Sequence, residues 1–198
     1  MPKLSAPSRD QRRRALLEAG WHCLATQAFR HLTIDEICAE AGASKGAFYG
    51  YFDHKQTFLL ALLEDDAAAL DVLMDELEAT QASAIHRLRR FAAAMLAQAQ
   101  DPGRLQVKAD LWAEMLTQPD VRTRLAGATA VRRARLRTWV EHGIAEGALV
   151  ATPANALASL LLALGDGLSL HAGLDQQAFQ WANIRRAVDL LLSGISVP

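Results

Sequence analysis

The chain has 198 residues, enough for one large domain or two small ones, and 51% of them are apolar. Charged residues make up 22%, which excludes a wholly disordered chain. The formal net charge of −1, taken alone, gives no sign of a nucleic-acid partner.

Alanine and leucine, both strong helix formers, dominate the chain and predict an all-α fold. The first helix is predicted from Ser8, which forms a capping box with Gln11. Thr33 and Glu36 form a second capping box, which opens a short helix that ends at Gly42. Ser44 is placed to cap a third short helix that runs to Tyr51.

Longer helices are predicted after these three. Asp53 is the expected cap of a long amphipathic helix, whose acidic residues we expect to be solvated. Thr152-Pro153 and Asp175 are the expected starts of the last two helices. The other helices are predicted over 83–100, up to 117, and from the break at 118–120 to about 146, which gives about nine helices in all.

Nothing in the sequence points to a cofactor, a metal or a membrane. Cys23 and Cys38 lack metal-ligand spacing and are expected to be buried free thiols. The apolar stretch Ala154–Leu170 contains Asn155, Asp166 and two glycines, so we expect a buried helix rather than a membrane span. The N-terminus has no apolar signal core, and a cytoplasmic protein is expected.

The segment from Thr33 to Lys55 has the pattern of a helix-turn-helix, with two short capped helices joined by Gly42-Ala43. The second helix of such a unit enters the DNA major groove. The candidate contacts are the cations Lys45 and Lys55, the hydroxyls of Tyr49 and Tyr51, and the small residues Gly46 and Ala47, which let backbone approach closely.

The charge is unevenly distributed. Residues 1–58 hold eight Lys and Arg against six Asp and Glu, a net of +2, and the remainder carries −3. Residues 1–14 alone carry +4, and Arg12 and Arg13 of this arm are candidate phosphate contacts. A charged N-terminal tail is also common as a merely solvated end.

Several runs resemble the TetR/AcrR family of bacterial transcriptional regulators over about residues 12–63. They are Leu16-Leu17-Glu18-Ala19, Leu32-Thr33-Ile34-Asp35-Glu36-Ile37, the stretch from Ala41 to Phe52 and Lys55-Gln56-Thr57-Phe58-Leu59. The resemblance implies a homodimer with a three-helix DNA-binding domain, here residues 1–54, and a ligand-binding and dimerisation domain, here 55–198. By position it implies DNA contacts at Thr33, Ser44, Lys45, Gly46, Ala47, Tyr49, Tyr51, His54 and Lys55.

The resemblance also implies that the last two helices form the dimer interface. Their apolar stripes supply the candidates Leu157, Leu161, Leu164, Leu168, Ile184, Val188 and Leu191. Gly165 and Gly167 would permit close helix approach. Apolar stripes of this kind also occur as core within one subunit.

The effector pocket is expected inside the remaining helices. Its candidates are the aromatic, Met, Leu and His side chains Phe91, Met95, Trp112, Met115, Leu116, Trp139 and His142. Any one of these residues could equally be ordinary core. The cluster Arg132-Arg133-Arg135-Arg137 is expected to be a solvated face.

The resemblance implies a ligand-responsive repressor that releases its operator when a small molecule binds, and the expected ligand is apolar or amphipathic. A helical small-molecule carrier or a small enzyme is the alternative, although the motifs of common nucleophile, metal and phosphate sites are absent from the sequence. A helix-turn-helix protein that activates transcription without an effector also fits the sequence.

Overall fold

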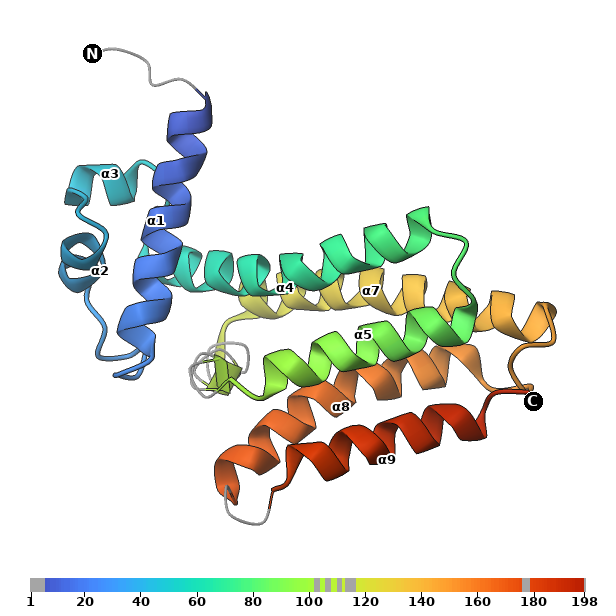
Figure 1. Ribbon diagram of the computed structural model, residues 1–198. Coiled ribbons are helices and arrows are strands. Elements are labelled where there is room, and N and C mark those ends of the chain that lie inside the picture. The colour runs from blue at the N-terminus through green and yellow to red at the C-terminus, as the bar shows by residue number, and fades with distance from the viewer. Residues whose placement is uncertain are drawn as a thin grey trace. The chain divides into compact units, whose positions relative to one another are not determined.

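The computed structural model describes residues 6–101, 104–105, 108–109, 112, 117–175 and 179–197, and eight α-helices lie within these ranges (Figure 1). They are α1 (Ala6–Leu24), α2 (Ile34–Glu40), α3 (Lys45–Tyr49), α4 (Lys55–Ala79), α5 (Ala84–Ala99), α7 (Pro119–Ala145), α8 (Ala154–Leu174) and α9 (Trp181–Gly194). The all-α prediction is confirmed, since extended pairing in the described ranges is limited to a single bridge between Leu149 and Ser196. The further helix predicted up to Thr117 lies largely outside the described residues.

The described residues form two compact units. One contains the chain up to Ala67 with the residues described between 106 and 117, and the other contains the rest. The first half of α4 therefore groups with the N-terminal unit. The division expected between residues 54 and 55 stays a prediction about domains.

Local capping explains the short helices of the N-terminal unit. The Glu36 amide donates to the Thr33 hydroxyl at 3.2 Å, and the Thr33 amide donates to the Glu36 carboxylate at 2.7 Å. This backbone hydrogen bond lowers the pKa of Glu36. Ser44 accepts from the Ala47 amide at 3.1 Å, and Gly42 turns the chain with φ of 60°.

Aromatic packing holds the N-terminal unit together. Phe48, Phe52 and Phe58 are buried, and their ring centroids lie 5.0 to 5.3 Å apart. A Cβ atom at Gly20 of α1 would lie 2.4 Å from the Phe58 ring, so the close packing of α1 on α4 requires glycine there. The three-helix arrangement is thus fixed by a small shared core.

In the C-terminal unit, α5 packs against α7, α8 and α9 (Figure 1). Phe91 of α5 and Trp139 of α7 are buried and meet edge to face, with centroids 6.4 Å apart. Gly143 and Gly165 lie at close crossings, where an added Cβ would be 2.7 Å from Ala84 and from Met95, respectively. Gly165 therefore permits close approach of α8 to α5 within one subunit.

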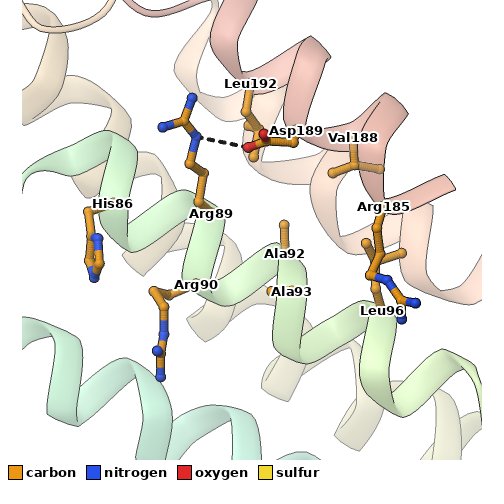
Figure 2. Close-up of a pocket in the computed structure, with 10 residues that line it drawn as sticks. All are labelled: His86, Arg89, Arg90, Ala92, Ala93, Leu96, Arg185, Val188, Asp189 and Leu192. Carbon is orange, nitrogen blue, oxygen red and sulfur yellow. Dashed lines mark ion pairs between the residues drawn. The ribbon is translucent and has the colours of Figure 1, made fainter. Parts of the chain in front are cut away.

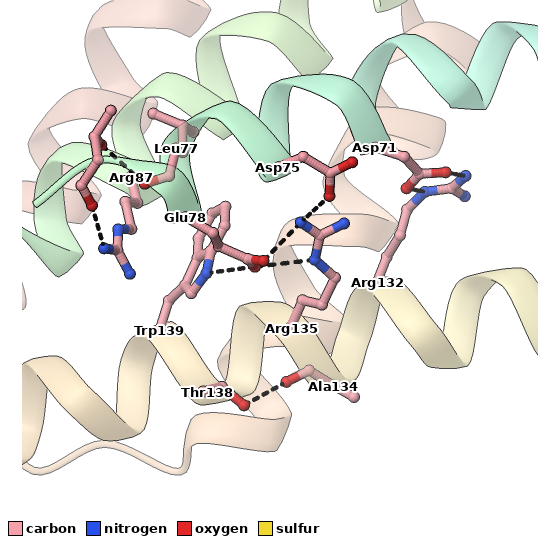
Figure 3. Close-up of polar contacts among 11 residues, drawn as sticks. Asp71, Asp75, Leu77, Glu78, Arg87, Arg132, Ala134, Arg135, Thr138 and Trp139 are labelled. Carbon is pink, nitrogen blue, oxygen red and sulfur yellow. Dashed lines mark hydrogen bonds and ion pairs between the residues drawn. The ribbon is translucent and has the colours of Figure 1, made fainter. Parts of the chain in front are cut away.

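Two arginines of α7 bind acidic side chains of α4 (Figure 3). Arg132 donates two hydrogen bonds to Asp71, at 2.7 and 2.8 Å. Arg135 donates to both Glu78 oxygens, at 2.9 and 2.8 Å, and to Asp75 at 2.7 Å. These bonds lower the pKa of Glu78. We expected the acidic residues of α4 and the arginine cluster of α7 to be solvated. That expectation is wrong for the residues that form these ion pairs.

Several predicted helix starts are displaced. α4 begins two residues after Asp53, and the Thr152 hydroxyl donates to a backbone carbonyl two residues earlier instead of capping α8. Asp175 follows the end of α8 and precedes α9 by six residues. Short polar residues favour turns as well as caps, so sequence alone does not separate the two roles.

α8 is long and apolar enough to cross a membrane by length and composition alone, which is weak evidence because core helices pass the same test. Only a minority of its residues are buried, so the expected buried helix is only partly buried. Leu160, Leu170 and Leu174 are exposed on it. An apolar helix with one exposed side is typical of a surface that another protein covers.

Candidate functional site

The turn of the helix-turn-helix borders a surface pocket of about 290 Å³ in the N-terminal unit. Four predicted DNA contacts line it: Arg12 from α1, and Ser44, Ala47 and Tyr51 from the helix-turn-helix. Residues that are far apart in sequence are thereby brought together at one place. This pocket contains both a cation and hydroxyl groups, which are the usual partners of phosphate oxygens.

Lys45 stands at the start of α3 with an exposed side chain. Its ammonium lies 2.7 Å from Asp35 of α2, and this ion pair raises the pKa of Lys45. The side chain is therefore a cation that is held in place by its neighbour. Because both partners are exposed, the pair is weak and can exchange with another anion.

The outer face of α3 is open. Tyr49 is 52% exposed, and its ring packs edge to face on Phe48 with centroids 5.7 Å apart. At Gly46 an added Cβ would meet nothing closer than the Ser44 hydroxyl, 3.9 Å away. A flat surface with an oriented phenol can approach a groove wall closely.

Lys55 is the first residue of α4 and is half-buried. Its ammonium lies 4.4 Å from the centre of the Phe29 ring and 3.4 Å from the Arg30 carbonyl oxygen, to which it donates. These contacts orient the cation beside the first amides of α4, where an anion is favoured. His54 precedes it and is exposed.

The basic N-terminal helix contacts the aromatic residues that follow α3. The Arg9 guanidinium lies 5.9 Å from the centre of the Tyr51 ring, and Arg13 lies 5.8 Å from that of Phe52. Arg13 was among the predicted contacts, whereas Arg9 was not. The +4 charge of the arm was the signal that could have included it.

Three of the predicted ligand residues lie in one core cluster. Phe91, Met95 and Trp139 are buried in the core, and the Trp139 indole donates to Glu78 at 3.0 Å. Trp112 is half-buried, whereas His142 is exposed and lies away from the core. Met115 and Leu116 lie outside the described residues.

Most predicted dimer residues pack on their own subunit. Leu161 and Val188 are core residues, and four others are half-buried against the core: Leu157, Leu164, Leu168 and Ile184. Leu191 alone among the seven is exposed, at 70%. Exposed leucines instead follow another stripe, with Leu160, Leu170 and Leu174 on α8 and Leu190 beside Leu191 on α9.

Both cysteines are free. Cys38 is buried and Cys23 is half-buried, and burial raises the pKa of both thiols. Because the thiolate is the nucleophile, a raised pKa lowers the reactivity of both thiols.

Two family models match the chain. One, described as bacterial regulatory proteins of the tetR family, matches residues 16–62. The other, described as the C-terminal part of BetI-type transcriptional repressors, matches residues 84–196, more than half of the chain.

Two curated relatives match in part. The chain is 36% identical over 58 residues to the HTH-type transcriptional regulator EthR of Mycolicibacterium smegmatis, covering 29% of this chain and 27% of that protein. It is 30% identical over 76 residues to the HTH-type transcriptional repressor AcnR of Corynebacterium diphtheriae, covering 38% of this chain and 40% of that protein. The chain thus matches less than half the length of these relatives.

A solved structure matches nearly the whole chain. It comes from Saccharomonospora viridis and is described as a transcriptional regulator in complex with choline. The TM-score is 0.79 at 24% identity, over 96% of this chain and 100% of that one. At this identity the likeness establishes the fold alone.

Proposed function

We propose, from the premise that this chain belongs to the TetR family of bacterial transcriptional regulators, that it is a repressor which leaves its DNA operator when a small molecule binds. The observation that carries the proposal is the open face of α3, where Lys45, Gly46 and Tyr49 are exposed beside the basic α1. In such units the second helix enters the major groove and neighbouring side chains contact phosphates.

The matched families are transcriptional regulators and not enzymes, which confirms the prediction that this chain is not an enzyme. The word repressor is supported by the BetI-type match and by the name of AcnR. Activity in the cytoplasm, where operator DNA lies, is part of the same proposal.

The proposed assembly is a homodimer through α8 and α9, because homodimers are typical of this family and two helix-turn-helix units bind two half-sites. The exposed leucines of α8 and α9 support this surface. On α8 the exposed positions 160, 163, 170 and 174 follow helical spacing and form one stripe. The proposed interface therefore uses the two helices that were predicted, but a different stripe of residues on α8.

The proposed effector binds in the C-terminal unit and is small and apolar or amphipathic. The choline complex of the relative from Saccharomonospora viridis supports a small-molecule site in this fold. The buried Phe91, Met95 and Trp139 remain the proposed lining, whereas Trp112 belongs to the other unit. The exposed His142 has less support than these three.

DNA binding can be tested with fragments of genomic DNA selected by the purified full-length protein and then used in gel-shift titrations. Tyr49→Phe removes one hydroxyl and keeps the ring, and Lys55→Gln removes one cation. Each variant should weaken binding about tenfold, the expected loss for a hydrogen bond to a charged group. Lys55→Gln should also reduce the slope of affinity against salt by about one.

Arg124→Gln is the matched control, because it removes one cation from an exposed position of α7 in the other unit. It should bind the same fragments like the wild type. Circular dichroism should show that all variants stay helical. If Tyr49→Phe and Lys55→Gln both bind like the control, the assigned surface is wrong, and if the wild type selects no DNA, the function is wrong.

A further inference from the structure

A surface groove of about 390 Å³ runs between α5 and α9 in the C-terminal unit (Figure 2). Its floor is apolar and is formed by Ala92, Ala93 and Leu96 of α5 and by Val188 and Leu192 of α9. Its volume falls at the small end of the range for ligand pockets, which is about 300 to 1,000 Å³.

The rim of the groove carries an excess of positive charge. Arg89, Arg90 and Arg185 line it together with one carboxylate, that of Asp189. Arg89 and Asp189 face each other across the groove, with Nε and Oδ1 3.1 Å apart (Figure 2). In the described part of the chain, neither Arg90 nor Arg185 has an ion-pair partner. Figure 2 shows that Arg90 extends away from α9, whereas Arg185 lies beside Leu96 at the other end of the groove, so the Arg185 guanidinium is the one available to an incoming anion.

We propose that this groove binds a free single-chain amphiphile with a carboxylate head, of about the size of a medium-chain fatty acid. The apolar floor removes the hydrocarbon chain from water, at about 25 cal/mol per Å² buried. The planar guanidinium of Arg185 matches the geometry of a carboxylate and repels a cationic head group. The charge on the rim thus selects the sign of the ligand.

The groove lies on the side of α9 away from the proposed dimer face. Positions 185, 189 and 192 face the groove, whereas 187, 190, 191 and 194 lie on the other side of a helix with 3.6 residues per turn. Dimerisation through Leu190 and Leu191 would leave the groove open. It is also separate from the buried cluster of Phe91 and Trp139, neither of which lines it.

Isothermal titration of the full-length protein with decanoate, below its micelle concentration, tests this site. Decyltrimethylammonium has the same chain and a cationic head, and decanol has no charge. Decanoate should bind at least about tenfold more tightly than either, because a charge-assisted hydrogen bond is worth about that factor. Equal binding of all three compounds would overturn the proposal.

Two pairs of variants locate the site. Ala93→Phe fills the groove from an exposed position and should abolish decanoate binding, whereas Ala97→Phe, one turn further on the exposed side of α5, should not change it. Arg185→Gln should weaken binding about tenfold, and the neighbouring exposed Arg186→Gln, which lies outside the groove, should not.

Three results would contradict the assignment. Decanoate binding that survives both Ala93→Phe and Arg185→Gln would place the ligand elsewhere. Ala93→Phe that yields monomers in sedimentation would make the groove an interface between copies of the chain. An undetectable decanoate titration of the wild type would exclude the ligand class. Because the groove shares no residue with the helix-turn-helix, each result leaves the DNA-binding proposal standing.

Discussion

At the scale of single residues, the cations of the proposed DNA-binding surface are oriented by contacts within the chain. Lys55 donates to the Arg30 carbonyl and lies over Phe29, which fixes its stem. Lys45 is paired with the exposed Asp35. A phosphate that approaches Lys45 must compete with this carboxylate, so Asp35 should moderate the affinity for DNA.

Replacing Asp35 with Asn should therefore strengthen DNA binding. Asn keeps the shape of the side chain and leaves the capping box of Thr33 and Glu36 intact. An exposed ion pair contributes up to about 1 kcal/mol, so the gain should be about two- to fivefold in gel-shift titrations. Glu76→Gln, which removes the same charge from an exposed site on α4, should leave the affinity unchanged. Equal affinities for both variants would mean that Lys45 is not at the DNA surface.

At the scale of helices, local chemistry predicted some boundaries and missed others. Ser83 caps α5 as its sequence indicates, with its hydroxyl accepting from the His86 amide at 3.4 Å. Gly147 ends α7 with φ of 72°, as a glycine after a helix predicts. Asp175 resembles a cap equally well, yet it follows the end of α8. Such choices depend on tertiary packing, which a single sequence does not show.

The same limit applies to helix faces. The apolar residues of α8 lie on more than one side of the helix, so the sequence predicts burial without showing which stripe meets the subunit's own core. Leu161 is in the core and Leu160 is exposed, although they are neighbours in the chain. The pairing of Arg135 with Glu78 is similarly hidden, because 57 residues separate the two partners. The family resemblance indicates which helices form an interface, but it does not show which face of each helix takes part.

Two glycines of α7 test how closely the helices pack. A Cβ at Gly143 would lie 2.6 Å from Leu149 Cδ1 and 2.7 Å from Ala84 Cβ, whereas Gly127 has nothing within 4 Å. Gly143→Ala should destabilise the protein by about 1–3 kcal/mol, since overpacking forces backbone shifts. Gly127→Ala should stabilise it by about 0.5–1 kcal/mol, because alanine loses less entropy in a helix. Urea denaturation of the two variants should give opposite signs, and a shared sign would contradict the packing.

At the scale of the whole molecule, positive charge is concentrated in the first 58 residues. Exposed apolar surface is concentrated on α8 and α9. The first 58 residues carry +2 and the remaining residues −3. The mildly basic first 58 residues suit a polyanion, and the acidic remainder of the chain disfavours DNA elsewhere. The exposed leucines of α8 and α9 would be unfavourable in a monomer and are explained if a second copy covers them.

A charge placed on the exposed leucine stripe should separate the proposed dimer. Leu191 is 70% exposed, and in a two-fold dimer Leu191→Glu introduces two carboxylates into one apolar interface. The dimer dissociation constant should rise about thirtyfold or more, equivalent to about 2 kcal/mol for a central apolar residue. Val131→Glu on α7 is the control, because Val131 is 62% exposed and lies outside the stripe. Sedimentation velocity over a concentration series should show monomers for Leu191→Glu alone, and gel shifts should show weaker operator binding for that variant. If the dimer of Leu191→Glu is as strong as that of the wild type, the interface lies on another face. Two carboxylates buried in the interface would cause a large loss of affinity.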